Sequence, residues 1–225
     1  MKSIKSFVFP VFIFVLFIVA STFNQSCNPD NPEESDADRC DTCAMVYKPN
    51  IYIYPEETTD LTLSFIFPQG GRVVASIPEY NNGWYFTVDT SGLIDDSYDY
   101  LFYESLQPDV WQLNKGWVVK RADLKDFFVE NMKDYGFSEK EIKDFTDYWI
   151  LRFTAEVYEI YPQNKQIIES VIKLDVSKKP DNLLRLFYTV RESNQKPGFT
   201  LPEPQIDLTF KREGFFITEW GVVLK

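Results

Sequence analysis

Any catalysis by this chain must rest on carboxylates, lysines, tyrosines or a metal held by oxygen ligands, because its 225 residues include no histidine. The absence excludes Ser-His and Cys-His nucleophile pairs, imidazole metal ligands and the usual general base at neutral pH. A Ser-x-x-Lys spelling occurs at Ser170 to Lys173. It lies in an apolar run that we expect to be a strand, where residues three apart point to opposite faces. It therefore does not predict a nucleophile.

Two glutamates lie in predicted strands with apolar surroundings. Both faces of the strand that carries Glu219 are apolar, which predicts that Glu219 is buried. Glu104 and Arg185 also share their strand faces with apolar or aromatic residues. Because a buried charge needs a partner, we expect Glu104 or Glu219 to pair with Arg185 or Lys48. The residues that share these faces are Phe215, Ile217, Val223, Tyr98, Tyr100, Phe102, Leu183 and Phe187.

Such a pairing has two interpretations. The simpler one is an ion pair that fixes the register of the strands. The alternative makes Glu104 and Glu219 the acid and base of a histidine-free hydrolase, with Arg185 beside them. In a carbohydrate site, Trp84, Trp111 or Trp220 would then stack on sugar rings, and Lys48 would contact the ligand. The separation of the two carboxylates decides between these interpretations.

Two other clusters suggest metal or redox chemistry but have simpler explanations. Cys40 and Cys43 form a Cys-x-x-Cys pair with no helical pattern behind it. In an oxidising compartment a local disulfide is the plain expectation, whereas zinc would need two neighbouring aspartates as further ligands. Asp95, Asp96 and Asp99 lack the spacing of a calcium loop and fit a polar turn. We therefore expect no metal and no cofactor.

The N-terminus resembles the signal of bacterial lipoproteins. Lys2 and Lys5 precede an apolar stretch at 7–20, and Cys27 follows a small residue. The apolar stretch is too short to span a bilayer comfortably. We expect residues 1–26 to be removed as a signal peptide and Cys27 to carry acyl chains such as palmitate. The alternative is cleavage after Ser21, which would release a secreted protein.

The segment 27–47 is predicted to be an acidic, flexible tether. It is similar to the acidic segments that route lipoproteins to the cell surface in Bacteroidetes-type envelopes. The whole chain has a net charge of −11, and removal of two lysines with the signal leaves about −13. Such a charge argues against nucleic acid and anionic headgroups as partners. The expected location is the bacterial cell envelope, at the outer membrane or cell surface, with a lipid anchor in the membrane.

Residues 48–225 are predicted to form one α+β domain, mainly of antiparallel strands with an inserted two-helix hairpin. The first strands, between 50 and 120, read as a meander. The helical hairpin occupies 122–151: apolar residues recur at helical spacing up to Gly136, and Ser138 with Glu141 spells a capping box. Strands resume between 153 and 225. The expected strands are 51–54, 61–67, 72–77, 84–88, 98–104, 117–120, 171–176 and 183–191, with a C-terminal hairpin of 206–211 and 215–224.

Several short motifs of this domain resemble an uncharacterised family of lipoprotein-like chains with a Lys-Pro-x-Ile-Tyr-x-Tyr-Pro opening. The resemblance covers most of residues 43–225, and the family has no established activity to carry over. The motifs are Lys48-Pro49-Asn50-Ile51-Tyr52-Ile53-Tyr54-Pro55, Tyr80 with Gly83-Trp84, Tyr100-Leu101-Phe102-Tyr103-Glu104, Tyr148-Trp149, and Gly214-Phe215 with Glu219-Trp220-Gly221.

The function that we expect is that of an envelope-anchored binding or assembly module rather than an enzyme. Its partner would be a glycan, a peptide or a protein, contacted through exposed aromatic residues. The alternatives are the hydrolase built on Glu104 and Glu219, and a purely structural component of the envelope.

Overall fold

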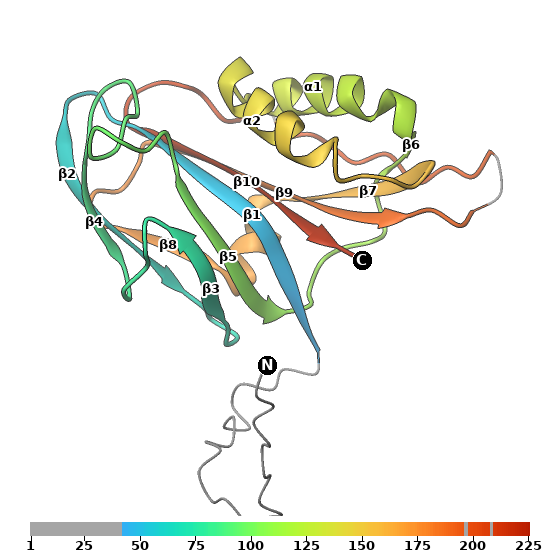
Figure 1. Ribbon diagram of the computed structural model, residues 1–225, viewed down its shortest axis with the longest axis horizontal. Coiled ribbons are helices and arrows are strands. Elements are labelled where there is room, and N and C mark those ends of the chain that lie inside the picture. The colour runs from blue at the N-terminus through green and yellow to red at the C-terminus, as the bar shows by residue number, and fades with distance from the viewer. Residues whose placement is uncertain (1–41, 196–197, 208) are drawn as a thin grey trace, which may run out of the picture. The chain divides into compact units, whose positions relative to one another are not determined.

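The computed structural model describes residues 42–195, 198–207 and 209–225, which contain a seven-stranded sheet (Figure 1). The strand order is β3-β5-β1-β10-β9-β7-β6. Neighbouring strands pair antiparallel, except that β9 and β10 run parallel. The strands are β1 (Cys43–Tyr54), β3 (Arg72–Ile77), β5 (Leu101–Pro108), β6 (Trp117–Lys120), β7 (Val157–Gln163), β9 (Asn182–Glu192) and β10 (Phe216–Leu224).

A second sheet of three strands, in the order β4-β2-β8, packs against one face of the large sheet. The central strand β2 (Thr59–Ile66) pairs antiparallel with β4 (Trp84–Val88) and with β8 (Lys173–Val176). Leu63 of β2 and Ile53 of β1 belong to the same buried cluster, so an apolar core joins the two sheets. The helix α3 (Lys165–Val171) contributes to a further cluster that includes residues of β1, β9 and β10.

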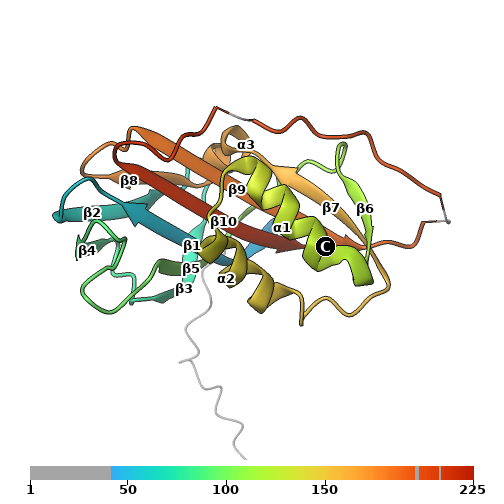
Figure 2. The ribbon, with the colours of Figure 1, turned by 90° about the horizontal axis from the view of Figure 1, so that it is seen from above.

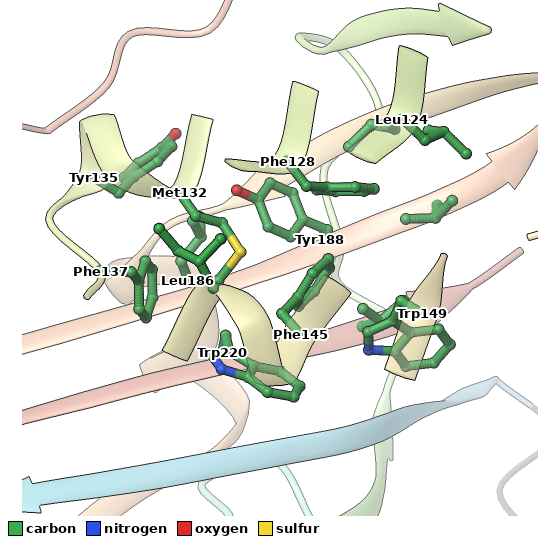
Figure 3. Packing of buried hydrophobic residues seen from close by; sticks show 14 of the residues in the cluster. Leu124, Phe128, Met132, Tyr135, Phe137, Phe145, Trp149, Leu186, Tyr188 and Trp220 are labelled. Atoms are coloured by element: carbon green, nitrogen blue, oxygen red, sulfur yellow. The ribbon is translucent and has the colours of Figure 1, made fainter. Parts of the chain in front are cut away.

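The helices α1 (Leu124–Tyr135) and α2 (Glu139–Trp149) form a hairpin over the other face of the large sheet (Figure 2). A single 3-10 turn, Arg121–Asp123, precedes α1. Apolar side chains from both helices interdigitate with residues of β9 and β10, because each amphipathic helix must cover its apolar stripe (Figure 3). The labelled members of this core are Leu124, Phe128, Met132, Tyr135, Phe137, Phe145, Trp149, Leu186, Tyr188 and Trp220.

The predicted α+β class and the helical hairpin are confirmed. Gly136 ends α1 with a φ of 103°, a left-handed conformation that glycine adopts without strain. The capping box is present as well: the Ser138 side chain accepts from the Glu141 N–H, and the Glu141 carboxylate accepts from the Ser138 N–H.

The predicted pairing of the strands was wrong in two places. The first strands do not form a meander, because β2 pairs with β4 and β8 while β3 pairs with β5. The C-terminal hairpin does not form either: 206–211 contains no strand among its described residues, and both edges of β10 are taken by β1 and β9. A strand that is apolar on both faces belongs in the middle of a sheet, which explains why β10 has two neighbours.

Several boundaries also differ from the prediction; β5, for example, runs from Leu101 to Pro108 and not from 98 to 104. The strand β1 begins at Cys43, so residues 43–47 belong to the sheet and not to the predicted tether. The run 171–176, predicted to be one strand, contains the end of α3 and all of β8. Asn164 caps α3 by accepting a hydrogen bond of 3.1 Å from the Ile167 N–H. The alternation of apolar residues with Lys173 and Asp175 fits a strand, and it concealed the helical turn that ends at Val171.

Candidate functional site

Glu219 forms a buried ion pair with Arg185, as the sequence predicted. The Glu219 side chain is 0% exposed, and its carboxylate accepts a hydrogen bond from Arg185 Nε. The Tyr103 hydroxyl donates a second hydrogen bond to Glu219 at 2.6 Å. Arg185 Nη1 also donates to the Ile172 carbonyl oxygen at 2.6 Å. The pair joins neighbouring positions of β9 and β10, which favours a structural role.

Glu104 does not join this network. It follows Tyr103 on β5, and successive side chains of a strand point to opposite faces. Because Tyr103 reaches Glu219, Glu104 lies on the other face of the large sheet. The structure therefore does not bring Glu104 and Glu219 together, and the proposed acid and base pair is wrong.

The three tryptophans considered as sugar platforms lie in the protein core. Trp84 is 5% exposed, Trp111 is 6% exposed and Trp220 is fully buried. Trp84 Nε1 donates to the Pro78 carbonyl oxygen at 2.9 Å. None of the three offers a ring face to a ligand, so this part of the prediction was also wrong.

The helix α2 lies along β1, and three of its residues meet the opening motif in order. Glu141 accepts a hydrogen bond of 2.8 Å from the Tyr54 hydroxyl. Asp144 accepts one of 3.0 Å from the Tyr52 hydroxyl. The Tyr148 ring lies 5.5 Å from Lys48 Nζ. Residues at positions i, i+3 and i+7 share one face of a helix, so the motif explains how α2 docks on β1.

Lys48 stands at an irregularity of β1. Between Tyr47 and Asn50, β1 contains one residue more than each of its neighbours β10 and β5. Such a bulge re-aims side chains. Lys48 has a φ of 53°, which is uncommon for a residue with a Cβ atom and is often found at functional sites.

The Lys48 ammonium group lies among aromatic rings. Its Nζ is 4.5 Å from the ring centre of Phe102 and 4.7 Å from that of Tyr100. It donates to Asn50 Oδ1 at 3.0 Å, while the Tyr100 hydroxyl is 3.5 Å away. Within the described ranges, no carboxylate lies within ion-pair distance of Lys48. An ammonium can donate three hydrogen bonds, so capacity remains for a ligand.

Burial lowers the pKa of Lys48 to about 8, because removal from water disfavours the charged form. Asp144 and Glu104 act in the opposite direction, and Arg152 adds to the lowering. Burial also raises the pKa of Asp144 above its ordinary value. Arg152 itself lies 3.6 Å from the ring centre of Tyr148. A lysine with a strongly perturbed pKa among aromatic side chains is a candidate functional residue.

We call this group of residues the Lys48 cluster. All of its members except the exposed Arg152 are half-buried. They come from β1, from β5 and the residue just before it, from α2 and from the turn that follows α2. The cluster comprises Lys48, Tyr100, Phe102, Glu104, Asp144, Tyr148 and Arg152.

Sequence reasoning named Lys48 and Glu104 but missed Asp144 and Arg152 as members of this site. The motifs shared with the resembling family indicate part of this site, because Lys48, Tyr100 and Tyr148 all belong to them. Asp144 looked like an ordinary solvent-facing residue of an amphipathic helix. Its contact with Tyr52 depends on how α2 lies against β1.

Other predictions concern metal, disulfide and lipid sites. Cys43 is disulfide-bonded, whereas Cys40 and Cys27 lie outside the described residues. Within the described part of the chain, no group of three or more His, Cys, Asp or Glu residues could hold a metal ion. Asp95, Asp96 and Asp99 therefore do not form such a group. Nor does any helix of the described residues have the length and apolar character needed to cross a membrane.

Comparison with known proteins gives no further guide: no family model, no curated protein and no solved structure matches this chain.

Proposed function

We propose that this chain is a lipid-anchored binding module of the bacterial cell envelope, and that it binds a neutral glycan at the Lys48 cluster. The observation that carries the proposal is the position of Lys48 Nζ beside three half-buried aromatic rings without a carboxylate partner in the described residues. Aromatic rings offer apolar faces to the C–H groups of a sugar, and a ligand oxygen can accept the remaining hydrogen bond of the ammonium.

The polar groups around the rings suit hydroxyl groups. Lys48 and Arg152 supply donors, whereas Asp144 and Glu104 supply acceptors. Asp144 uses one carboxylate oxygen for Tyr52, and Glu104 makes no side-chain hydrogen bond to any part of the chain that the structure describes. A sugar hydroxyl both donates and accepts, so neighbouring hydroxyls can bridge the cationic and anionic members of the cluster.

Charge favours a neutral ligand over an acidic one. Two cations and two carboxylates leave the cluster near balance, and the chain as a whole has a net charge of −11. An acidic polysaccharide would approach against this field. The predicted acyl chains on Cys27 would hold the domain at the envelope surface, where it would meet glycans.

A hydrolase built on Glu104 and Glu219 has no support, because the two side chains lie on opposite faces of the sheet. A structural role of the protein remains the second candidate. The Glu219 and Arg185 ion pair and the two hydrogen bonds from Arg212 to Glu141 are contacts within the protein that stabilise its fold. They do not identify another protein as a binding partner.

The proposal can be tested on a glycan array that carries neutral glucans, mannans and xylans, acidic polygalacturonate and alginate, and peptidoglycan fragments. The wild-type chain should bind at least one neutral glycan, and Lys48→Met and Tyr148→Ala should each weaken that binding about tenfold or more. Tyr85→Ala is a matched control, because Tyr85 is 73% exposed and lies outside the cluster. Analysis of the bound glycan should find no cleavage. Absence of binding to every neutral glycan would refute the proposal.

A further inference from the structure

The strand β9 has an unpaired side at its beginning. It pairs with β10 from Asn182 to Val190, but with β7 only from Phe187 to Glu192. Residues 182–186 therefore have a neighbour on one side only, although β9 lies inside the sheet. This gap is independent of the Lys48 cluster.

The direction of the peptide groups along β9 follows from contacts at its two ends. The Val190 carbonyl oxygen accepts from the Lys225 N–H beyond β10, and the Asn182 N–H lies 3.4 Å from the Phe215 carbonyl oxygen just before β10. Even-numbered residues of β9 therefore turn their N–H and C=O groups toward β10. Odd-numbered residues turn theirs the other way, because neighbouring peptide groups alternate in a strand. Leu183 and Arg185 thus present their peptide groups to the gap.

A cavity of about 390 Å³ lies along this side of β9. Four consecutive residues of β9, from Asn182 to Arg185, line one wall. The lining also includes Gln205, Asp207, Thr209 and Phe210, which belong to the segment before β10. A second cavity of about 360 Å³ shares Tyr135, Asn164 and Gln205 with the first, so the hollow continues past the end of β7.

The described residues 198–207 and 209–212 of this segment form no strand that pairs with β9. The segment runs beside α1, on the side away from α2 (Figure 2). The Pro202 carbonyl oxygen accepts a hydrogen bond of 3.0 Å from the Gly116 N–H, and Arg212 binds Glu141. Pro202 and Pro204 have no N–H to offer a strand. Among the described residues, this segment makes no backbone hydrogen bond to Leu183 or Arg185.

We infer that the gap beside β9 binds an extended peptide, which adds as a strand between β9 and the segment before β10. The free donors and acceptors of Leu183 and Arg185 would supply main-chain hydrogen bonds, the basis of binding by strand addition. The charged side chains that line the cavity, apart from Arg185 with its buried guanidinium, are Lys165, Asp181 and Asp207. The excess of carboxylates, together with the acidic chain, favours a peptide that carries lysine or arginine.

The test uses a fluorescent octapeptide of four Lys-Val repeats, a version N-methylated at every valine, and a version of four Glu-Val repeats. The purified full chain should bind the Lys-Val peptide, and N-methylation should weaken binding tenfold or more while the peptide charge stays the same. The Glu-Val peptide should bind more weakly than the Lys-Val peptide. Failure of the Lys-Val peptide to bind at millimolar concentration, or equal binding of its N-methylated form, would overturn the inference.

Two variants separate the backbone from the side chain. Leu183→Pro removes the N–H that faces the gap, and Leu183→Ala shortens the side chain but keeps the N–H. Peptide affinity should fall about tenfold more in Leu183→Pro than in Leu183→Ala, from the loss of one hydrogen bond and the obstruction by the proline ring. Equal affinities would contradict the inference.

Hydrogen exchange of the wild-type chain gives a readout that does not depend on the folding of a variant. The peptide should slow exchange of the Leu183 and Arg185 amides and leave that of Leu184, which faces β10, unchanged. Protection spread evenly over β9, or a dimer of this chain that the peptide disrupts, would assign the gap to another role and overturn the inference.

Discussion

Arg212 makes two hydrogen bonds of 3.0 Å to the two carboxylate oxygens of Glu141. The Glu141 side chain is completely buried in the first turn of α2. It also accepts hydrogen bonds from the Tyr54 hydroxyl, the Thr218 hydroxyl and the Ser138 N–H. One carboxylate therefore ties α2 to β1, to β10 and to the segment before β10.

Glu141→Gln should lower the free energy of unfolding by about 3 kcal/mol, because the amide cannot accept from all of these donors and leaves Arg212 without its counter-charge. Urea denaturation measures the change. Glu139→Gln is the matched control, since Glu139 lies in the same helical turn and is exposed. Equal stability of the two variants would contradict the role given to Glu141.

The same carboxylate predicts a pH dependence. Burial alone would raise the pKa of Glu141, but Arg212 and the other donors hold it below its ordinary value. The folded chain then binds fewer protons at Glu141 than the unfolded chain does. Its contribution to stability is full above the unfolded pKa of about 4.5 and is lost as the pH falls through the folded pKa. Between pH 3 and pH 6, the free energy of unfolding should change less with pH in Glu141→Gln than in Glu139→Gln, as measured by urea denaturation at each pH.

The pKa of Lys48 should lie far below the ordinary value for lysine. After methylation of the lysines with carbon-13, NMR should show one signal with a pKa of about 8, compared with the model-peptide value of about 10.4. The signal should be missing from Lys48→Arg. Because the folded pKa is lower than the unfolded value of 10.5, the Lys48 contribution to stability should rise between pH 8 and pH 10.5. A spectrum in which every lysine titrates above pH 10 would contradict the burial of this ammonium.

The burial of a single side chain could be predicted from the sequence more reliably than the contacts between side chains on different strands. Glu219 could be predicted to be buried because its own strand is apolar on both faces, and that property is local. The relation between Glu104 and Glu219 could not be predicted, because it depends on which face of β5 meets β10. The bulge at Lys48 shifts the alternation of β1 by one residue, so that Val46 and Tyr52 lie in different core clusters. A reading based on strict alternation places them on one face.

The resembling motifs have a physical basis that only the fold reveals. A Cβ atom at Gly221 would lie 3.0 Å from the Phe187 ring and 3.2 Å from Pro49, so the Glu-Trp-Gly motif leaves room for the Lys-Pro motif beside it. Residues 49 and 221 are far apart in the sequence, and no pattern within either motif indicates this contact. The helices were easier to predict, because their caps at Gly136 and Ser138 are local signals.

The buried ion pair should matter for stability and not for ligand binding. Glu219→Gln should lower the free energy of unfolding by about 3 to 5 kcal/mol, because it leaves the Arg185 charge buried without a counter-charge. Glu219→Leu combined with Arg185→Met should recover more than half of that loss, since an apolar pair of similar size needs no partner. Denaturant titration measures both variants, and a stable Glu219→Gln protein would contradict this assignment.

The proposed lipid anchor rests on Cys27. Cells that express the wild-type chain and are fed labelled palmitate should yield a labelled protein in the membrane fraction. Cys27→Ser should abolish the label, whereas Cys43→Ser should retain it. A wild-type chain that is unlabelled and keeps its first methionine would contradict the anchor.

Glycan binding at the Lys48 cluster can be observed at the lysine itself, by following the NMR signal of methylated Lys48 while the neutral glycan that binds best on the array is added. If the glycan binds at the Lys48 cluster, this signal shifts and saturates at the glycan concentration at which binding saturates, while the other lysine signals stay in place. Saturable binding that leaves the Lys48 signal unchanged would show that the glycan binds elsewhere and would refute the proposed site.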